Sequence, residues 1–207
     1  MRRLLYLCAI LLAVVGCASP SPFADDASIA AVSYRDPGTS SLTLYTMVNN
    51  RTGAGGHSAL LINASEQVIF DPAGSFYADI VPERNDVLFG ITPGIERAYR
   101  SAHARSTHHV VSQTVQVTAA QAEIAYQLAL TAGPVPGAMC AQSISSLLRK
   151  VPGFEPINTT YYPVKLQEQF ETIPGVQTEK LVEEDEPDLN AALKKANAKL
   201  NTAPSPN

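Results

Sequence analysis

The chain has 207 residues, of which 45% are hydrophobic and 16% charged, and its formal net charge is −4. This length fits one globular domain with flanking segments, since domains commonly contain about 100–200 residues. With 15 Lys and Arg residues against 19 Asp and Glu, the chain lacks the excess positive charge that neutralises phosphates, which argues against nucleic-acid binding. Three cysteines are too few for a disulfide scaffold.

Residues 1–16 have the regions of a bacterial signal peptide. Arg2 and Arg3 precede an apolar run from Leu4 to Val15, which is shorter than the about 20 residues that span a bilayer. The run leads into Val14-Val15-Gly16-Cys17, which resembles the lipobox of bacterial lipoproteins. The alternative is a soluble export signal that is cleaved near Ala18 and Ser19.

The lipobox resemblance implies that Cys17 becomes the first residue, carries fatty acyl groups such as palmitate, and anchors the protein to a membrane of the cell envelope. Ala18, after the cysteine, resembles the signal for sorting to the outer membrane, on the periplasmic face. Cleavage removes Cys8, so Cys140 remains as the free thiol.

Composition divides the rest of the chain into three parts. Residues 17–31 are rich in Ala, Ser, Pro and Asp without periodicity, and are expected to form a flexible lipidated tether. Residues 32–174 are expected to form the folded domain. Residues 175–207 are charged and alanine-rich, and are expected to form a solvated helix and a disordered tail.

The first elements of the domain read as an antiparallel meander. Three β-rich segments are separated by turn sequences: Ser40 to Val48, His57 to Ile62, and Gln67 to Phe70. The glycine-rich stretch from Asn49 to Gly56 forms the first turn, and Asp71-Pro72-Ala73-Gly74 ends the third strand.

Helices dominate the second half, so the predicted fold class is α+β. The expected elements are a helix near 93–104, a strand from His108 to Val117, a helix that begins at a Thr118–Gln121 capping box, a helix from Met139 to Lys150, and a packed segment from Tyr161 to Phe170.

Cys140 is a candidate nucleophile because it lies in the first turn of its predicted helix. A helix N-terminus lowers the pKa of a thiol through unsatisfied N–H groups and the positive end of the dipole. Cys140 also shares an apolar stripe with Ile144, Leu147 and Leu148. The alternative is therefore a core cysteine without chemistry.

His57 is the candidate base, because the glycines before it allow a close approach of substrate. The alternative is a surface histidine at a strand edge. His103 is expected on a solvated helix face, while His108 and His109 point to opposite faces of a strand. No zinc-binding spacing, G-x-S-x-G elbow or phosphate-binding loop occurs, so no metal or other cofactor is expected.

The order of these motifs resembles the circularly permuted papain-like hydrolases, the permuted NlpC-type group that includes the lecithin retinol acyltransferases. The segment Gly56-His57-Ser58-Ala59-Leu60-Leu61-Ile62 is similar to the family's Gly-His strand, and the helix that begins at Cys140 is similar to its Asn-Cys helix. The resemblance spans about residues 42–150.

The resemblance implies a papain-like fold in which Cys140 is the nucleophile, His57 the general base and acid, and Asp71 the third member. A strict offset places Phe70 at the third position, and Asp71 has the alternative role of capping its own turn. Met139 replaces the family's Asn, which leaves the backbone N–H of Cys140 as the oxyanion donor.

The resulting hypothesis is an envelope lipoprotein that acts as a thiol protease, amidase or acyltransferase through a Cys140 thioester. The family implies amide or ester substrates, with peptidoglycan peptides and lipids both open. The alternative is a lipoprotein that uses the same fold as a binding or structural module.

Overall fold

The computed structural model describes residues 22–202. Its helices are α2 (Asp26–Ala31), α3 (Pro93–His103), α4 (Ala119–Leu130), α5 (Cys140–Leu148), α6 (Pro163–Glu171) and α7 (Leu189–Thr202). Its strands are β1 (Ser41–Asn49), β2 (Gly55–Asn63), β3 (Gln67–Phe70), β4 (Glu83–Arg84), β5 (Val87–Leu88), β6 (His108–Gln116) and β7 (Gln177–Leu181). The predicted signal peptide, with Cys8, and the predicted lipidation site at Cys17 lie outside the described residues.

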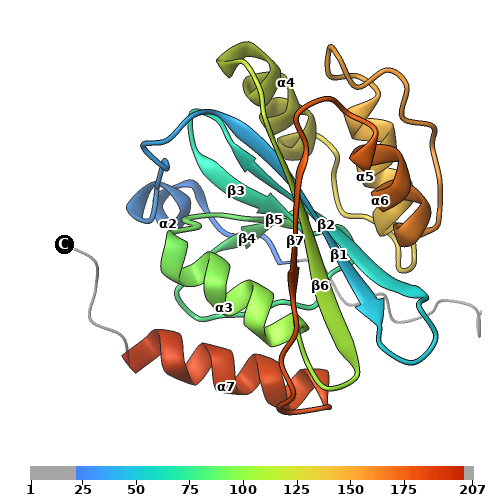
Figure 1. Ribbon diagram of the computed structural model, residues 1–207. Helices are drawn as coiled ribbons and strands as arrows, with labels where there is room; N and C mark the ends of the chain where they lie inside the picture. Colours follow the sequence, from blue (N-terminus) through green and yellow to red (C-terminus); the bar gives the residue numbers. More distant parts are fainter. Residues whose placement is uncertain (1–21, 203–207) are drawn as a thin grey trace, which may run out of the picture.

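The strands form one seven-stranded antiparallel sheet in the order β4-β5-β3-β2-β1-β6-β7 (Figure 1). β1 pairs with β2, and β2 pairs with β3, which confirms the predicted meander. The sheet and its helices make the fold class α+β, as predicted.

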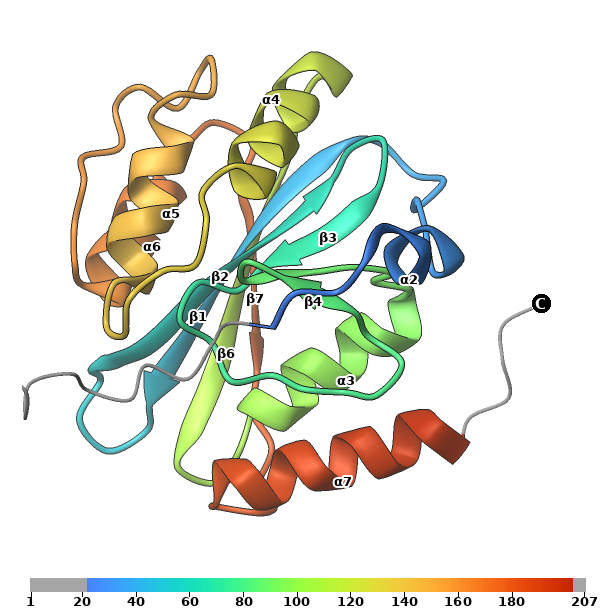
Figure 2. The same cartoon turned by 180° about the vertical axis from the view of Figure 1, so that it is seen from behind.

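Helices cover both faces of the sheet, with α4, α5 and α6 on one side and α3 and α7 on the other (Figures 1 and 2). Successive side chains of a strand point to opposite faces. Leu42 and Leu44 of β1 therefore enter the core under α4, α5 and α6, while Tyr45 and Met47 enter the core under α3. The site described below lies where β2 and β3 meet both layers.

The predicted elements of the second half are present. The helix expected near 93–104 is α3, capped by Thr92, and the capping box of Thr118 and Gln121 begins α4. The helix that carries Cys140 is α5, and the packed segment before Phe170 is α6.

The segment after residue 174 is expected from its sequence to hold a solvated helix and a disordered tail. The helix is present as α7, whereas β7 lies in a part that is not expected to form a strand. β7 pairs with β6 along its whole length. α7 packs against α3 and buries Ala192, Leu193 and Ala196. Because β7 is held through its backbone, its exposed polar side chains gave no strand signal.

Residues 17–31 are expected from their sequence to form a flexible tether, but residues 22–31, the part that the structure describes, contain a helix and contacts with β4. The ring of Phe23 lies under the guanidinium of Arg84, 4.8 Å from centroid to Cζ, and the same guanidinium bonds the carbonyl of Ala24. Asp25 then caps the short helix α2. The chain is therefore attached to β4 from residue 22 onward.

Candidate active site

The register of β2 and β3 brings His57 and Asp71 to the same face of the sheet. Leu61 pairs with Ile69, and Ala59, Leu61 and Ile69 all enter the core under α3. By alternation, His57 and Asp71, two residues beyond this set on each strand, point to that face as diagonal neighbours. Phe70 points the other way into the core under α5, so it does not face His57 and cannot be its carboxylate-side partner.

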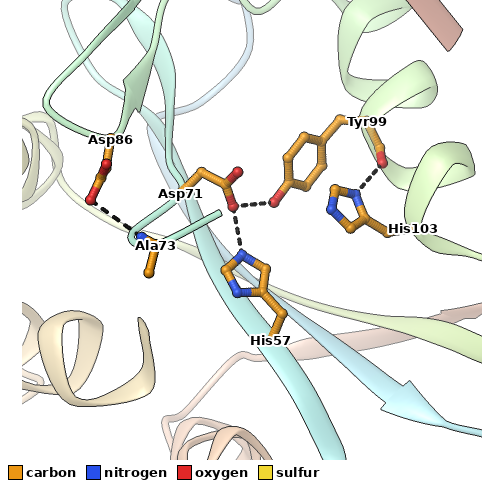
Figure 3. A network of polar contacts seen from close by, with 6 residues as sticks. All are labelled: His57, Asp71, Ala73, Asp86, Tyr99 and His103. Carbon is orange, nitrogen blue, oxygen red and sulfur yellow. Dashed lines mark hydrogen bonds and ion pairs between the residues drawn. The ribbon is translucent and has the colours of Figure 1, made fainter. Parts of the chain in front are cut away.

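The carboxylate of Asp71 binds the imidazole of His57. Nε2 of His57 lies 2.7 Å from Oδ1 of Asp71, and the hydroxyl of Tyr99 donates to the same oxygen at 2.7 Å (Figure 3). Burial raises the pKa of Asp71, but the charge and hydrogen bond of His57 outweigh it and leave that pKa lowered. The turn after Asp71 is closed by the backbone N–H of Gly74 on the Asp71 carbonyl, so the carboxylate faces the histidine.

Cys140 occupies the first residue of α5, and its thiol lies close enough to His57 for each group to shift the pKa of the other. Burial raises the pKa of Cys140, but the hydrogen bond and charge of His57 and the backbone N–H groups of Ser58 and Ala141 lower it below its ordinary value. Since Nε2 of His57 binds Asp71, Nδ1 is the nitrogen left for the thiol. Cys140 is 6% exposed, so access to it is narrow.

His57 carries the opposite shift. Burial lowers its pKa, yet the charge and hydrogen bond of Asp71, reinforced by Cys140, raise it to about 10. A raised imidazolium pKa beside a lowered thiol pKa favours the thiolate–imidazolium pair at neutral pH. This pair is the reactive form of a cysteine nucleophile.

The start of α5 has no side-chain cap. Met139 occupies the N-cap position and makes no capping hydrogen bond. The N–H groups of a first helical turn have no partner inside the helix. Those of Cys140 and its neighbours are therefore available to the thiolate and to a developing oxyanion.

Asp86 joins the loops on either side of the site, a role that the sequence did not reveal. It lies in the tight turn between β4 and β5, with φ at 63°. Its carboxylate accepts the backbone N–H of Ala73 at 3.2 Å (Figure 3). The carboxylate also accepts the N–H of Val135 at 2.7 Å, and the carbonyl of Asp86 accepts the N–H of Asp71 at 2.8 Å. Asp86 thereby ties the Asp71 loop to the loop that leads into Cys140.

His103 is buried, which corrects the prediction of a solvated helix face. Its exposure is 3%, and its ring stacks 6.2 Å from that of His57. Nδ1 lies 2.7 Å from the carbonyl of Tyr99 (Figure 3). Burial lowers the pKa of His103 to about 4, so this histidine is neutral at neutral pH. The i, i+4, i+8 spacing of Ile95, Tyr99 and His103 could have revealed this buried stripe.

The remaining histidines separate as the strand pattern predicts. His109 Nδ1 contacts the amide of Asn50 at 2.7 Å. His108 lies near Arg105 and lines a pocket beside His57. Within residues 22–202, no group of three or more His, Cys, Asp or Glu side chains is arranged to hold a metal ion.

Comparison with protein families, with curated proteins and with solved structures finds no match for this chain. In the part of the chain that the structure describes, no helix is long and apolar enough to cross a membrane.

Proposed function

We propose that this protein is a cysteine hydrolase or acyltransferase that acts on amide or ester bonds through a Cys140 thioester. The observation that carries the proposal is the His57 imidazole, whose Nε2 binds Asp71 and whose charge lowers the pKa of the Cys140 thiol at the start of α5. A cysteine that only fills the core needs neither a histidine beside it nor a carboxylate that binds this histidine.

In the first step, the Cys140 thiolate attacks the carbonyl carbon of the substrate and forms a C–S bond. The carbonyl π electrons move to oxygen, and the N–H of Cys140 at the start of α5 donates to this oxyanion. When the oxyanion collapses, the amide or ester bond breaks, and the leaving nitrogen or oxygen takes the proton of the His57 imidazolium. The product is a thioester on Cys140.

In the second step, the neutral His57 removes a proton from the incoming nucleophile. Water as the nucleophile gives hydrolysis, and an amine or alcohol gives acyl transfer. The nucleophile forms a bond to the acyl carbon, the C–S bond breaks, and the thiolate and imidazolium are restored. Asp71 keeps the ring oriented throughout.

The proposed fold is papain-like and circularly permuted. Its support is the chain order, since the histidine strand precedes the cysteine helix, and the packing of α5 against β2. Peptidoglycan peptides and lipids are the two substrate classes that we propose to test.

Alkylation of Cys140 by iodoacetamide tests the proposal. We expect Cys140 to react faster than a model thiol at neutral pH, with the modified site read from the Cys140 peptide by mass spectrometry. A thioester should also accumulate with an activated ester in the wild type and be absent in Cys140→Ser. A rate no faster than the model thiol contradicts the proposal and favours the binding-module alternative.

We further propose that residues 1–16 are a lipoprotein signal and that a lipid on Cys17 holds the domain at the cell envelope, on the periplasmic face of the outer membrane. The support is the apolar run followed by Gly16-Cys17. Labelling of cells with a tagged palmitate should mark the wild type and leave Cys17→Ala unmarked. Equal labelling of both proteins contradicts this proposal.

A further inference from the structure

A pocket of about 300 Å³ has His57 in its lining. Gly56 and Gly74 lie in its wall, together with the apolar side chains of Met47 and Leu189. Its polar lining includes His57, His103, Arg105 and His108. A substrate that reaches the His57 ring therefore meets this pocket.

The pocket has no acidic side chain in its lining. The nearest carboxylate of the site, Asp71, is already bound to His57 and Tyr99. His103 and His108 are neutral at neutral pH, because burial lowers the pKa of each. Among the lining side chains, His57 and Arg105 therefore carry positive charge. The charge of His57 is balanced by Asp71, whereas no carboxylate of the described residues is bound to Arg105.

Arg105 is buried and incompletely bonded. It is 8% exposed, and its Nε has no hydrogen-bond partner among the described residues. One terminal nitrogen lies 3.3 Å from Nδ1 of His108. Within residues 22–202, the ion pairs of arginines involve Arg84 and Arg100, while Asp188 acts on Arg105 only through its charge at longer range. A buried guanidinium without a bound anion is unfavourable, so this one has unused binding capacity.

The backbone holds Arg105 in place. Arg105 and His108 exchange two backbone hydrogen bonds, of 2.7 and 3.0 Å, in the turn between α3 and β6. The amide of Asn50 also donates to the Arg105 carbonyl. Because the side chain is also buried, the guanidinium loses less freedom on binding a planar anion than an exposed arginine would.

We propose that this pocket binds a carboxylate of the substrate and that Arg105 is its principal donor. The proposal rests on the proposed function and narrows it to amide or ester substrates with a free carboxylate near the scissile bond, as in a peptide. One guanidinium fork can donate two parallel N–H···O bonds to one carboxylate. The same fork also matches a phosphate, so phosphate is included as a competitor in the titration below.

Binding is best measured on the full chain with Cys140→Ser, so that no chemistry occurs. N-acetylalanine, its primary amide and inorganic phosphate are titrated at millimolar concentrations, and the amide signals of Gly56 and Gly74 are followed by NMR. The Nε–H signal of Arg105 reports on the guanidinium directly. We expect the acid to bind at least about tenfold more tightly than the amide, because a charge-assisted hydrogen bond is lost with the carboxylate.

Substitutions assign the preference to Arg105. Arg105→Gln in the same background should abolish the preference for the acid, Arg105→Lys should retain part of it, and Arg149→Gln, which changes an exposed arginine, should leave it intact. If Arg105→Gln does not fold, the Nε–H signal of Arg105 still decides, since it must shift with the acid and not with the amide.

Equal binding of acid and amide, binding of neither, or a preference that survives Arg105→Gln overturns the proposal, and so does tighter binding of phosphate than of the acid. Carboxylate binding that persists in a protein whose Cys140 proves unreactive refutes the proposed function and leaves the pocket assignment standing.

Discussion

Two histidines of the site stack 6.2 Å apart and carry opposite pKa shifts. The pKa of His57 is raised to about 10 and the pKa of His103 is lowered to about 4, although burial by itself lowers both. The difference lies in their partners. His57 binds the Asp71 carboxylate, whereas the Nδ1 of His103 faces a neutral backbone carbonyl. One carboxylate therefore decides which ring is charged.

The largest loss is expected when the charged ring is removed. His57→Ala leaves Cys140 buried without its imidazolium, so both alkylation at neutral pH and turnover should fall by at least about 100-fold. The pH midpoint of alkylation should rise, because the imidazolium that lowers the thiol pKa is gone. His109→Ala, at a partly exposed ring, is the control. An unchanged midpoint in His57→Ala would refute the pairing.

Asp71→Asn should make His57 resemble His103. Without the carboxylate charge, burial dominates, and we expect the pKa of His57 to fall from about 10 toward or below its ordinary value. Cys140 alkylation at neutral pH should drop by about tenfold or more. The His57 ring titration is followed by NMR. A ring that still loses its proton only near pH 10 contradicts the assignment of Asp71 as the cause.

Gly74→Ala tests the position of the Asp71 carboxylate while its charge is kept. A Cβ at Gly74 would lie 1.9 Å from Oδ2 of Asp71, so the carboxylate must move away from its observed position. We expect Cys140 alkylation to slow several-fold and the His57 pKa to fall. Gly137→Ala is the matched control, because a Cβ there meets open space. Equal behaviour of the two variants would show that the carboxylate shifts without losing His57.

A smaller effect is expected from Asp86→Asn, which keeps the shape and the positive φ but loses the charge that binds Ala73 and Val135. We expect the free energy of unfolding to fall by about 2 kcal/mol and the alkylation rate to fall modestly. Urea unfolding and alkylation report the two effects. Asp36→Asn is the control, because it alters a partly exposed carboxylate that accepts the backbone N–H of Gly38 and the hydroxyl of Tyr34. A stability loss without a rate change would mean that Asp86 does not position the loops.

Of these variants, His103→Phe should change the alkylation rate of Cys140 least. Its main effect should be on how the free energy of unfolding depends on pH in the acid range. The folded pKa of His103 lies below its ordinary value, so its contribution to stability is fully present above pH 6.5 and is lost as the pH falls toward 4. The loss amounts to about 3 kcal/mol over that window. Urea unfolding at both ends should therefore show a weaker acid dependence in His103→Phe than in the wild type. Equal dependence would mean that another group governs acid unfolding.

The sequence predicted the parts of the site that lie on periodic elements. Strand alternation and the glycine turn located His57, and the helical stripe located Cys140. The contacts that complete the site join segments that are distant along the chain. Asp86 acts through two backbone N–H groups, and β7 through backbone pairing, so neither leaves a pattern of side-chain types. The burial of His103 depends on Tyr99, one turn earlier in α3, and on Phe76, which the loop after β3 supplies.

The attachment of residues 22–26 to β4 limits how far the domain can stand from a lipid on Cys17. Five residues from Cys17 to Pro22 span at most about 18 Å when fully extended. The carbonyl of Pro22 accepts the N–H of Asn85. Asn85 is the neighbour of Asp86, which joins the two loops on either side of the candidate site. A lipid anchor at Cys17 would therefore keep the candidate active site within a short reach of the bilayer surface.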